Sequence, residues 1–172
     1  MTVDVETPRW EPALLRVLAG WNPAVPARAL TRALAYVWAS PISLVGLVAG
    51  AATAVRPTRR EGVLLFPHAR GITGWVLRKR HYAAGTFGHV VVCTRDPEPS
   101  LMAHELIHTR QAERFGPLMA PVYLGLLAIY RYRRHPMERA ARLAEQRLTD
   151  QKAAAGGPAR ARMSGDGGPP DR

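Results

Sequence analysis

Two histidines and a glutamate stand close together in the run His104-Glu105-Leu106-Ile107-His108. Residues four apart on an α-helix project from the same face one turn apart, so two imidazoles at this spacing can bind a single zinc ion. Glu105, beside the first histidine, can take a proton from a water molecule that attacks a carbonyl and pass it to the leaving amine. The motif predicts a zinc-dependent peptidase with His104 and His108 as metal ligands and Glu105 as the catalytic residue.

A catalytic zinc ion normally has a third protein ligand, and the motif helix itself does not supply one. The metzincin pattern is excluded, because Gln111 and Arg114 stand where that class has a glycine and a third histidine. Glu113 projects about 140° around the helix from His108, so it cannot readily face the same metal. The third ligand is therefore expected from a later part of the chain.

Two glutamates on a later predicted helix, Glu138 and Glu145, are candidates for the third ligand. Pro136 favours the first turn of that helix, which we expect to end near Asp150. Glu138 is preferred, because its position in the first turn places it near the inner end of a helix that can fold back over the motif helix. The alternative reading of Glu138 is a solvated residue paired with Arg142 one turn later.

The order of these residues resembles that of the membrane gluzincins of the HtpX and BlaR type and of the soluble minigluzincins. The shared features are the motif at 104–108, an apolar segment, and a glutamate followed three residues later by alanine, here Glu138 and Ala141. In those families that glutamate is the third zinc ligand, so the resemblance implies this role for Glu138 and a minigluzincin-like fold. Arg142 stands where the membrane families commonly have the aspartate that would orient a ligand histidine.

The elements that must position the motif follow from the residue pattern around it. Short runs rich in β-branched and aromatic residues at Gly62 to Phe66, Trp75 to Tyr82 and Thr86 to Thr94 predict a small antiparallel β-meander. Ser100 is the expected N-cap of the motif helix, which should end at Phe115. We expect an α+β fold. The resemblance to zincins implies that the strand at Thr86 to Thr94 lies at the sheet edge and binds an extended peptide, and the alternative is an ordinary core strand.

An apolar stretch of 23 uncharged residues, from Ala33 to Val55, lies between Arg32 and Arg56. A helix that spans a membrane needs about 20 such residues, so the stretch is the best candidate for a transmembrane or membrane-inserted segment. Pro41 and several glycines keep a re-entrant hairpin or a buried core helix open as alternatives.

At 172 residues the chain has room for one compact domain with appendages. We expect an amphipathic segment at 1–32, the membrane segment at 33–55, a zincin-like catalytic domain at 56–150 and a disordered tail at 151–172.

The charge and the cysteine count indicate where such a protein would act. The formal net charge of +11 comes from arginines scattered along the chain, which argues against a nucleic-acid partner and is compatible with anionic lipid headgroups. The one cysteine, Cys93, allows no intramolecular disulfide and favours a reducing compartment. We therefore expect a membrane-associated protein with a cytoplasmic active site that acts on peptides or proteins, and the sequence leaves the oligomeric state open.

Four further polar residues are weaker candidates for the site. His89 precedes the motif helix and could approach the metal, and Tyr132, Arg134 or His135 could stabilise an oxyanion. Two other readings of the chain remain: a non-catalytic membrane protein with a structural or sensory zinc site, and a lipid-surface or nucleic-acid-binding protein in which the motif is accidental.

Overall fold

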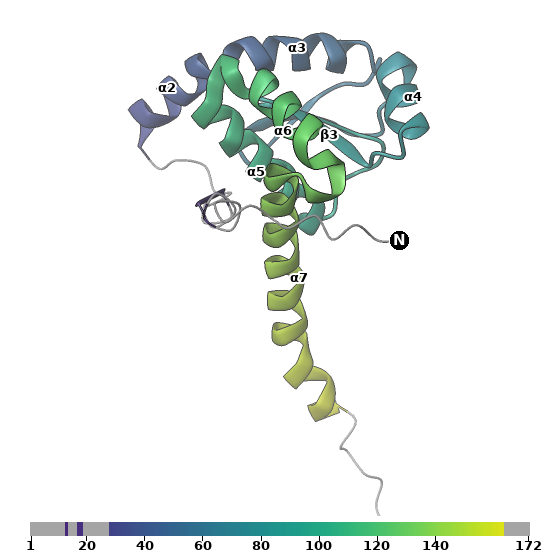
Figure 1. Ribbon diagram of the computed structural model, residues 1–172. Helices are drawn as coiled ribbons and strands as arrows, with labels where there is room; N and C mark the ends of the chain where they lie inside the picture. The colour runs from purple at the N-terminus through teal and green to yellow at the C-terminus, as the bar shows by residue number, and fades with distance from the viewer. Residues whose placement is uncertain (1–12, 14–16, 19–27, 164–172) are drawn as a thin grey trace, which may run out of the picture.

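The computed structural model describes residues 13, 17, 18 and 28–163, and it is an α+β protein, as expected. A four-stranded sheet lies within a body of helices, and one long helix projects from that body (Figure 1). The elements in chain order are α2 (Ala29–Trp38), α3 (Ser40–Ala51), β1 (Thr58–Arg60), β2 (Val63–Phe66), α4 (Gly71–Lys79), β3 (Ala84–Phe87), β4 (Val90–Cys93), α5 (Pro99–Phe115), the 3-10 turn η1 (Gly116–Leu118), α6 (Met119–Arg134) and α7 (Pro136–Met163).

The sheet is mixed, so the expected antiparallel meander is wrong. Its strand order is β1-β2-β4-β3, and β2 pairs with β4 in parallel. The run from Trp75 to Tyr82 is not a strand, because Ile72, Trp75 and Val76 follow a helical spacing and form α4. A helix between β2 and the next hairpin lets the chain cross over and return in the same direction.

The expected strand from Thr86 to Thr94 is instead part of a hairpin. Gly88 adopts a φ of +60°, which turns the chain between β3 and β4. In the resulting order β4 is central and β3 is an edge strand. The expectation of an edge strand before the motif helix therefore holds for β3 alone.

Side chains of the two central strands alternate between two apolar clusters, one on each face of the sheet. On one face, Val63 and Val91 belong to a cluster with Met102 and Leu106 of α5. On the other face, Phe66, Val90 and Val92 belong to a cluster with Leu77 of α4. The sheet thus holds the motif helix on one side, and α3 and α4 cover the opposite side.

The segment 33–55 forms two helices rather than one straight span. Helices α2 and α3 meet at an angle of 69°, and Pro41 lies in the first turn of α3. Helix α3 packs on the sheet, because Gly46 lies against Phe87 and Val90 and Gly50 lies against Phe66. No single helix among the described residues has the length and apolar character of a membrane span, whereas the bent pair reaches that threshold together.

The ends of the chain differ from the expected segments where the structure describes them. Most of the segment 1–32 lies outside the described residues, but Leu18 is buried in a cluster with Met137 and Ala140. Helix α7 extends 13 residues beyond Asp150, where we expected it to end, and so includes residues 151–163 of the expected tail. The three alanines after Lys152 favour the first part of this extension. Residues 164–172 lie outside the described part.

Candidate metal centre

Helix α5 carries the motif and lies between the sheet and α7. It begins at Pro99, with Glu98 rather than the expected Ser100 as its N-cap, and it ends at Phe115, as expected, with Gly116 as its C-cap. Apart from the partly exposed His104, every residue from Met102 to Ala112 is buried. The motif helix is therefore a core element whose polar side chains must find partners inside the protein.

Helix α7 brings the distant glutamate to this helix. Pro136 begins α7, and Glu138 lies in its first turn, as expected. Ala140 and Ala141 are completely buried, and these small residues let the axes of α5 and α7 approach closely. The kink at Arg131, with a φ of +56°, redirects the end of α6 just before α7 begins. Glu138 consequently faces the motif helix.

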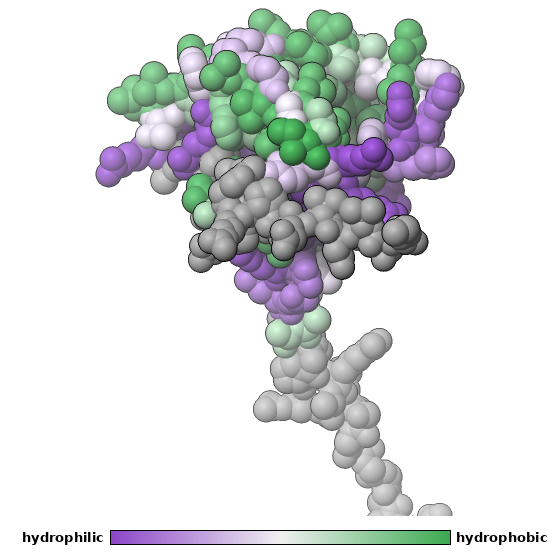
Figure 2. All heavy atoms as spheres, in the orientation of Figure 1, coloured by the Kyte–Doolittle hydropathy of each residue, from purple (hydrophilic) through white to green (hydrophobic). Residues whose placement is uncertain are grey.

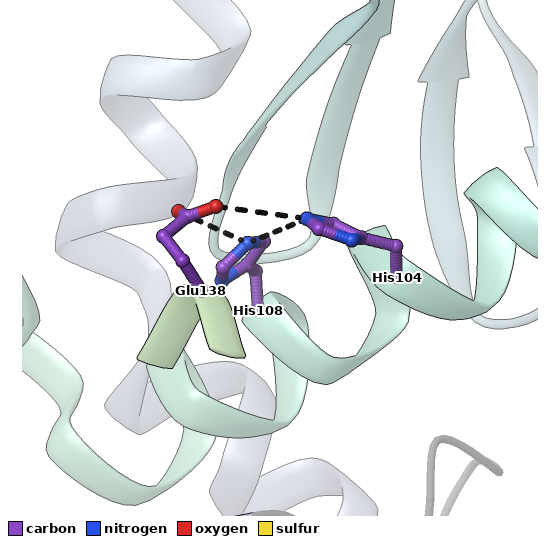
Figure 3. Close-up of side chains that lie close together, drawn as sticks. All are labelled: His104, His108 and Glu138. Atoms are coloured by element: carbon purple, nitrogen blue, oxygen red, sulfur yellow. Dashed lines mark hydrogen bonds and ion pairs between the residues drawn. The ribbon is translucent and has the colours of Figure 1, made fainter. Parts of the chain in front are cut away.

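His104 and His108 of α5 and Glu138 of α7 converge on one point (Figure 3). The Nε2 atoms of the two histidines are 3.3 Å apart. The Glu138 carboxylate places Oε2 at 3.8 Å from His104 Nε2 and Oε1 at 3.4 Å from His108 Nε2. One ligand atom from each residue lies within 4.8 Å of the others, so the group can hold a metal ion.

The second nitrogen of each imidazole has its own acceptor. His108 Nδ1 lies 2.9 Å from Oε1 of the buried Gln111, whose Nε2 donates to the carbonyl of Met137 at 3.1 Å. His104 Nδ1 lies 3.2 Å from Oε2 of Glu145. With the protons held at Nδ1, both Nε2 lone pairs are directed toward the point where the three side chains meet.

The electrostatics keep a negative charge at this point. Burial raises the pKa of the Glu138 carboxyl, but the hydrogen bond to His104, the charge of His108 and a hydrogen bond from Tyr123 outweigh it and lower the pKa to about 2. Burial disfavours the protonated form of His104, yet the neighbouring carboxylates raise its pKa above the ordinary value. Tyr123 on α6 donates to Glu138 Oε1 at 2.8 Å. The site is therefore suited to a cation.

Glu105 is buried beside this group but is not one of the three converging residues. Its Oε2 accepts a hydrogen bond of 2.5 Å from Thr86 on the edge strand β3. Its charge nevertheless contributes to the raised pKa of His104. The hydrogen bond from Thr86 links the motif helix directly to the strand that we expected to bind a peptide.

The weaker candidates separate into two groups. His89 does not reach the metal centre: its Nε2 pairs with Glu113 at 2.9 Å, and its ring stacks on Tyr36. His135 is completely buried and donates from Nε2 to the carbonyl of Tyr123 at 3.0 Å, while burial lowers its pKa. Neither histidine is free to contact a substrate.

Tyr132, by contrast, lies at the margin of the centre and is partly exposed. Burial, the charge of Glu138 and a hydrogen bond to Glu138 raise its pKa to about 12. Tyr132 therefore keeps its phenolic proton at neutral pH. For Arg134 the described structure gives no contact with the three converging residues.

Three supporting residues escaped the sequence argument in part or entirely. Gln111 lies three residues after His108, a spacing that allows contact on a helix, so this partner could have been found. Glu145 was considered only as a ligand; its position seven residues after Glu138 places both on one face of α7, which explains its contact with His104 instead. Tyr123 lies on a separate helix, and no local spacing indicates its contact with Glu138.

The fold and the three converging residues define an α+β protein with a candidate metal centre. Comparisons with known protein families, with curated proteins and with solved structures give no match to this chain. The function must therefore be argued from the centre itself.

Proposed function

We propose that the chain is a zinc-dependent metalloendopeptidase of the gluzincin type, with His104, His108 and Glu138 as zinc ligands and Glu105 as the catalytic acid and base. The observation that carries the proposal is the convergence of two imidazole nitrogens, four residues apart on one helix, with a carboxylate from a later helix. This ligand set of two histidines and one glutamate is the one that catalytic zinc sites of thermolysin type use.

The separations between the ligand atoms support zinc over larger cations. Two ligands that are each about 2.0 to 2.1 Å from a tetrahedral zinc ion lie about 3.3 to 3.4 Å from one another. The two shorter separations in the group, 3.3 Å and 3.4 Å, have this length. Calcium and magnesium prefer oxygen ligands, and a group with two imidazole nitrogens does not suit them.

Under this proposal, Glu105, Tyr132 and the edge strand β3 each have a part in peptide hydrolysis. A zinc ion at this position supplies Lewis-acid chemistry, which acidifies water and polarises a carbonyl. Glu105 accepts the proton of the attacking water and returns it to the leaving amine. Tyr132 keeps its proton at neutral pH and can donate a hydrogen bond to the oxyanion. An extended substrate can add to the outer edge of β3, beside Thr86, by main-chain hydrogen bonds, since no described strand pairs with that edge.

The test is a comparison of the wild-type chain with Glu105→Gln, using bound zinc and the cleavage of an unfolded protein such as casein as readouts. The variant should keep its zinc, because Glu105 is not among the converging ligands, and should lose about 100-fold to 10,000-fold in cleavage rate. Asp150→Asn makes the same carboxylate-to-amide change at an exposed site on α7 and should cleave normally. Undiminished cleavage by Glu105→Gln would rule out the assigned base.

One observation favours a second candidate function, a non-catalytic zinc site with a structural or sensory role. His108 and Glu138 are only 8% and 4% exposed, and Arg142 approaches Glu138 to 4.0 Å, so the centre is well enclosed. A structural zinc ion has four protein ligands and no open position. Under this alternative the wild-type chain binds zinc but cleaves neither casein nor any member of a broad peptide library.

A further inference from the structure

Helices α2 and α3 present an apolar surface to the outside of the protein. Their outward side chains are large and apolar, and each is more than half exposed: Leu30, Leu34, Val37, Leu44, Val45 and Val48. On α2 these residues are four and three apart, and on α3 both Leu44 and Val45 lie one turn before Val48, so on each helix the side chains share one face. A contiguous surface of this kind on a folded protein marks an interaction site.

The opposite side of α3 is fixed to the sheet. Its two buried glycines, Gly46 and Gly50, lie against side chains of the sheet, and Ser43 Oγ accepts a hydrogen bond of 3.0 Å from the backbone of His89. Thr73 of α4 donates to the carbonyl of Ala49 at 2.7 Å. The exposed apolar side chains are therefore held in place by the fold, and α3 lies flat on the body of the protein.

Neighbouring elements extend this surface at both ends of α3. On α4, Ile72, Trp75 and Val76 are exposed at a helical spacing. At the other end, Trp38 lies against Gly116 of η1, and Leu118 of the same turn is exposed. Figure 2 shows apolar side chains gathered along the side of the molecule formed by α2, α3 and α4, with hydrophilic side chains toward its margins. We call this surface the apolar face.

The charged residues on the helices that form and border the apolar face are all basic. Helices α2, α3, α4 and α6 and the turn η1 contain no acidic residue. Exposed arginines stand at both ends of the apolar stretch, at Arg28 and Arg32 before it and at Arg56 and Arg59 after it. An apolar surface with a cationic rim is complementary to an anionic lipid bilayer, in which acyl chains lie beneath negatively charged headgroups.

We propose that the apolar face is a lipid-docking surface by which the protein lies on an anionic membrane, with α2 and α3 parallel to the bilayer rather than across it. The exposed indole rings of Trp38 and Trp75 suit the headgroup level, where tryptophan is enriched. A second copy of the chain fits less well, because a two-fold interface would bring two sets of arginines together, and the described helices of this face carry no acidic residue to pair with them.

Docking through the apolar face does not depend on zinc, because α5, which carries the metal centre, and α3 pack on opposite faces of the sheet. On α6, Tyr123 donates to Glu138, whereas Leu124, the next residue, is 61% exposed. Helix α6 thus contacts the metal centre on one side and solvent on the other. Docking of the apolar face would hold the protein, and with it the centre, at the membrane.

Sedimentation of the full chain with vesicles tests the proposal. The vesicles are phosphatidylcholine alone, or phosphatidylcholine with one third phosphatidylglycerol. The wild-type chain should sediment with the anionic vesicles, and Leu34→Glu/Val48→Glu should bind them at least about tenfold more weakly, since two apolar contacts are replaced by repelled charges. Gln146→Glu/Gln151→Glu makes the same change in net charge at exposed positions of α7. It should lose less vesicle binding than Leu34→Glu/Val48→Glu, and the loss that it shows measures the effect of net charge alone.

Three further measurements make the result decisive. Circular dichroism should show that both double variants are folded, and His108→Ala should sediment like the wild-type chain, which separates docking from the metal centre. Absence of vesicle binding by the wild-type chain, or equal binding by Leu34→Glu/Val48→Glu, would overturn the proposal. The proposal would also be overturned if light scattering showed a wild-type dimer that does not sediment with vesicles and that Leu34→Glu/Val48→Glu dissociates.

Discussion

Gln111 is the residue whose replacement tests most sharply how the metal centre is held. It is completely buried, accepts a hydrogen bond from His108 Nδ1 at 2.9 Å and donates to the carbonyl of Met137 at 3.1 Å. Met137 directly precedes Glu138 in the chain. One amide thus fixes the ring of one ligand and ties α5 to the turn of α7 that carries another. Gln111→Leu removes both hydrogen bonds and fills the same space with an apolar side chain of similar size.

The magnitude of the effect follows from these two contacts. A buried donor left without an acceptor costs about 1 to 3 kcal/mol, and an ordinary lost hydrogen bond costs about 0.5 to 1.5 kcal/mol. The metal-free Gln111→Leu variant should therefore lose about 2 to 4 kcal/mol of unfolding free energy. Because the ring of His108 is no longer held by an acceptor, zinc affinity should fall by about 10-fold to 100-fold, as for other residues that orient a ligand histidine.

The assay is a competition between the protein and a zinc chelator, combined with urea unfolding of the metal-free chain. Gln111→Glu keeps an acceptor for His108 but loses the donor to Met137, so it should retain more zinc affinity than Gln111→Leu. Gln146→Leu makes the same exchange at an exposed position of α7 and should behave like the wild-type chain. Wild-type zinc affinity in a folded Gln111→Leu variant would refute the assigned role of Gln111.

Two further predictions concern the core around the centre. A Cβ atom at Gly46 would lie 2.7 Å from the Cβ atoms of Phe87 and Val90, so Gly46→Ala should lower the unfolding free energy by about 1 to 3 kcal/mol. Gly125→Ala adds its Cβ in open space and should raise the unfolding free energy by up to about 1 kcal/mol. Urea unfolding measures both changes. Burial, and then the charge of Glu105, raise the pKa of the Cys93 thiol from 9.0 to about 12. Iodoacetamide at pH 8 should therefore modify the native thiol at least about 1,000-fold more slowly than the thiol of the urea-unfolded chain. Comparable rates would show that Cys93 is not in the core.

The parts of the centre that local spacing determines could be predicted from the sequence. His104 and His108 share a helix face because they are four residues apart, and this holds whatever surrounds the helix. Pro136 marks the start of the later helix and so places Glu138 in its first turn. Tyr123 could not be found in this way, because its contact with Glu138 depends on how α6 packs against α7.

The topology of the sheet could not be predicted in this way, because one wrongly predicted strand, which is the helix α4, changes the strand pairing. The run from Trp75 to Tyr82 contains aromatic and β-branched residues after Gly71 and Gly74, so residue preference alone favours a strand there. Its apolar positions are nevertheless helical in spacing, and Leu77 joins the core cluster on one face of the sheet. Once this run is a helix, β2 pairs with β4 in parallel rather than in a meander.

The apolar stretch from Ala33 to Val55 illustrates a limit of hydropathy as a signal. Its length and composition match a membrane span, but its glycines let one side of α3 pack closely on the sheet. The large apolar residues lie on the outer side of α2 and α3. Sequence hydropathy could not distinguish a span from a helix pair with one buried and one exposed side, because the two have the same composition.

Metal analysis of the purified full chain tests the central claim most directly. After incubation with zinc and removal of unbound metal, the wild-type chain should retain one zinc ion, because three ligand atoms converge on one point. A folded His104→Ala/His108→Ala variant should retain none. A folded wild-type chain without zinc, or a double variant with the same zinc content as the wild type, would contradict the account.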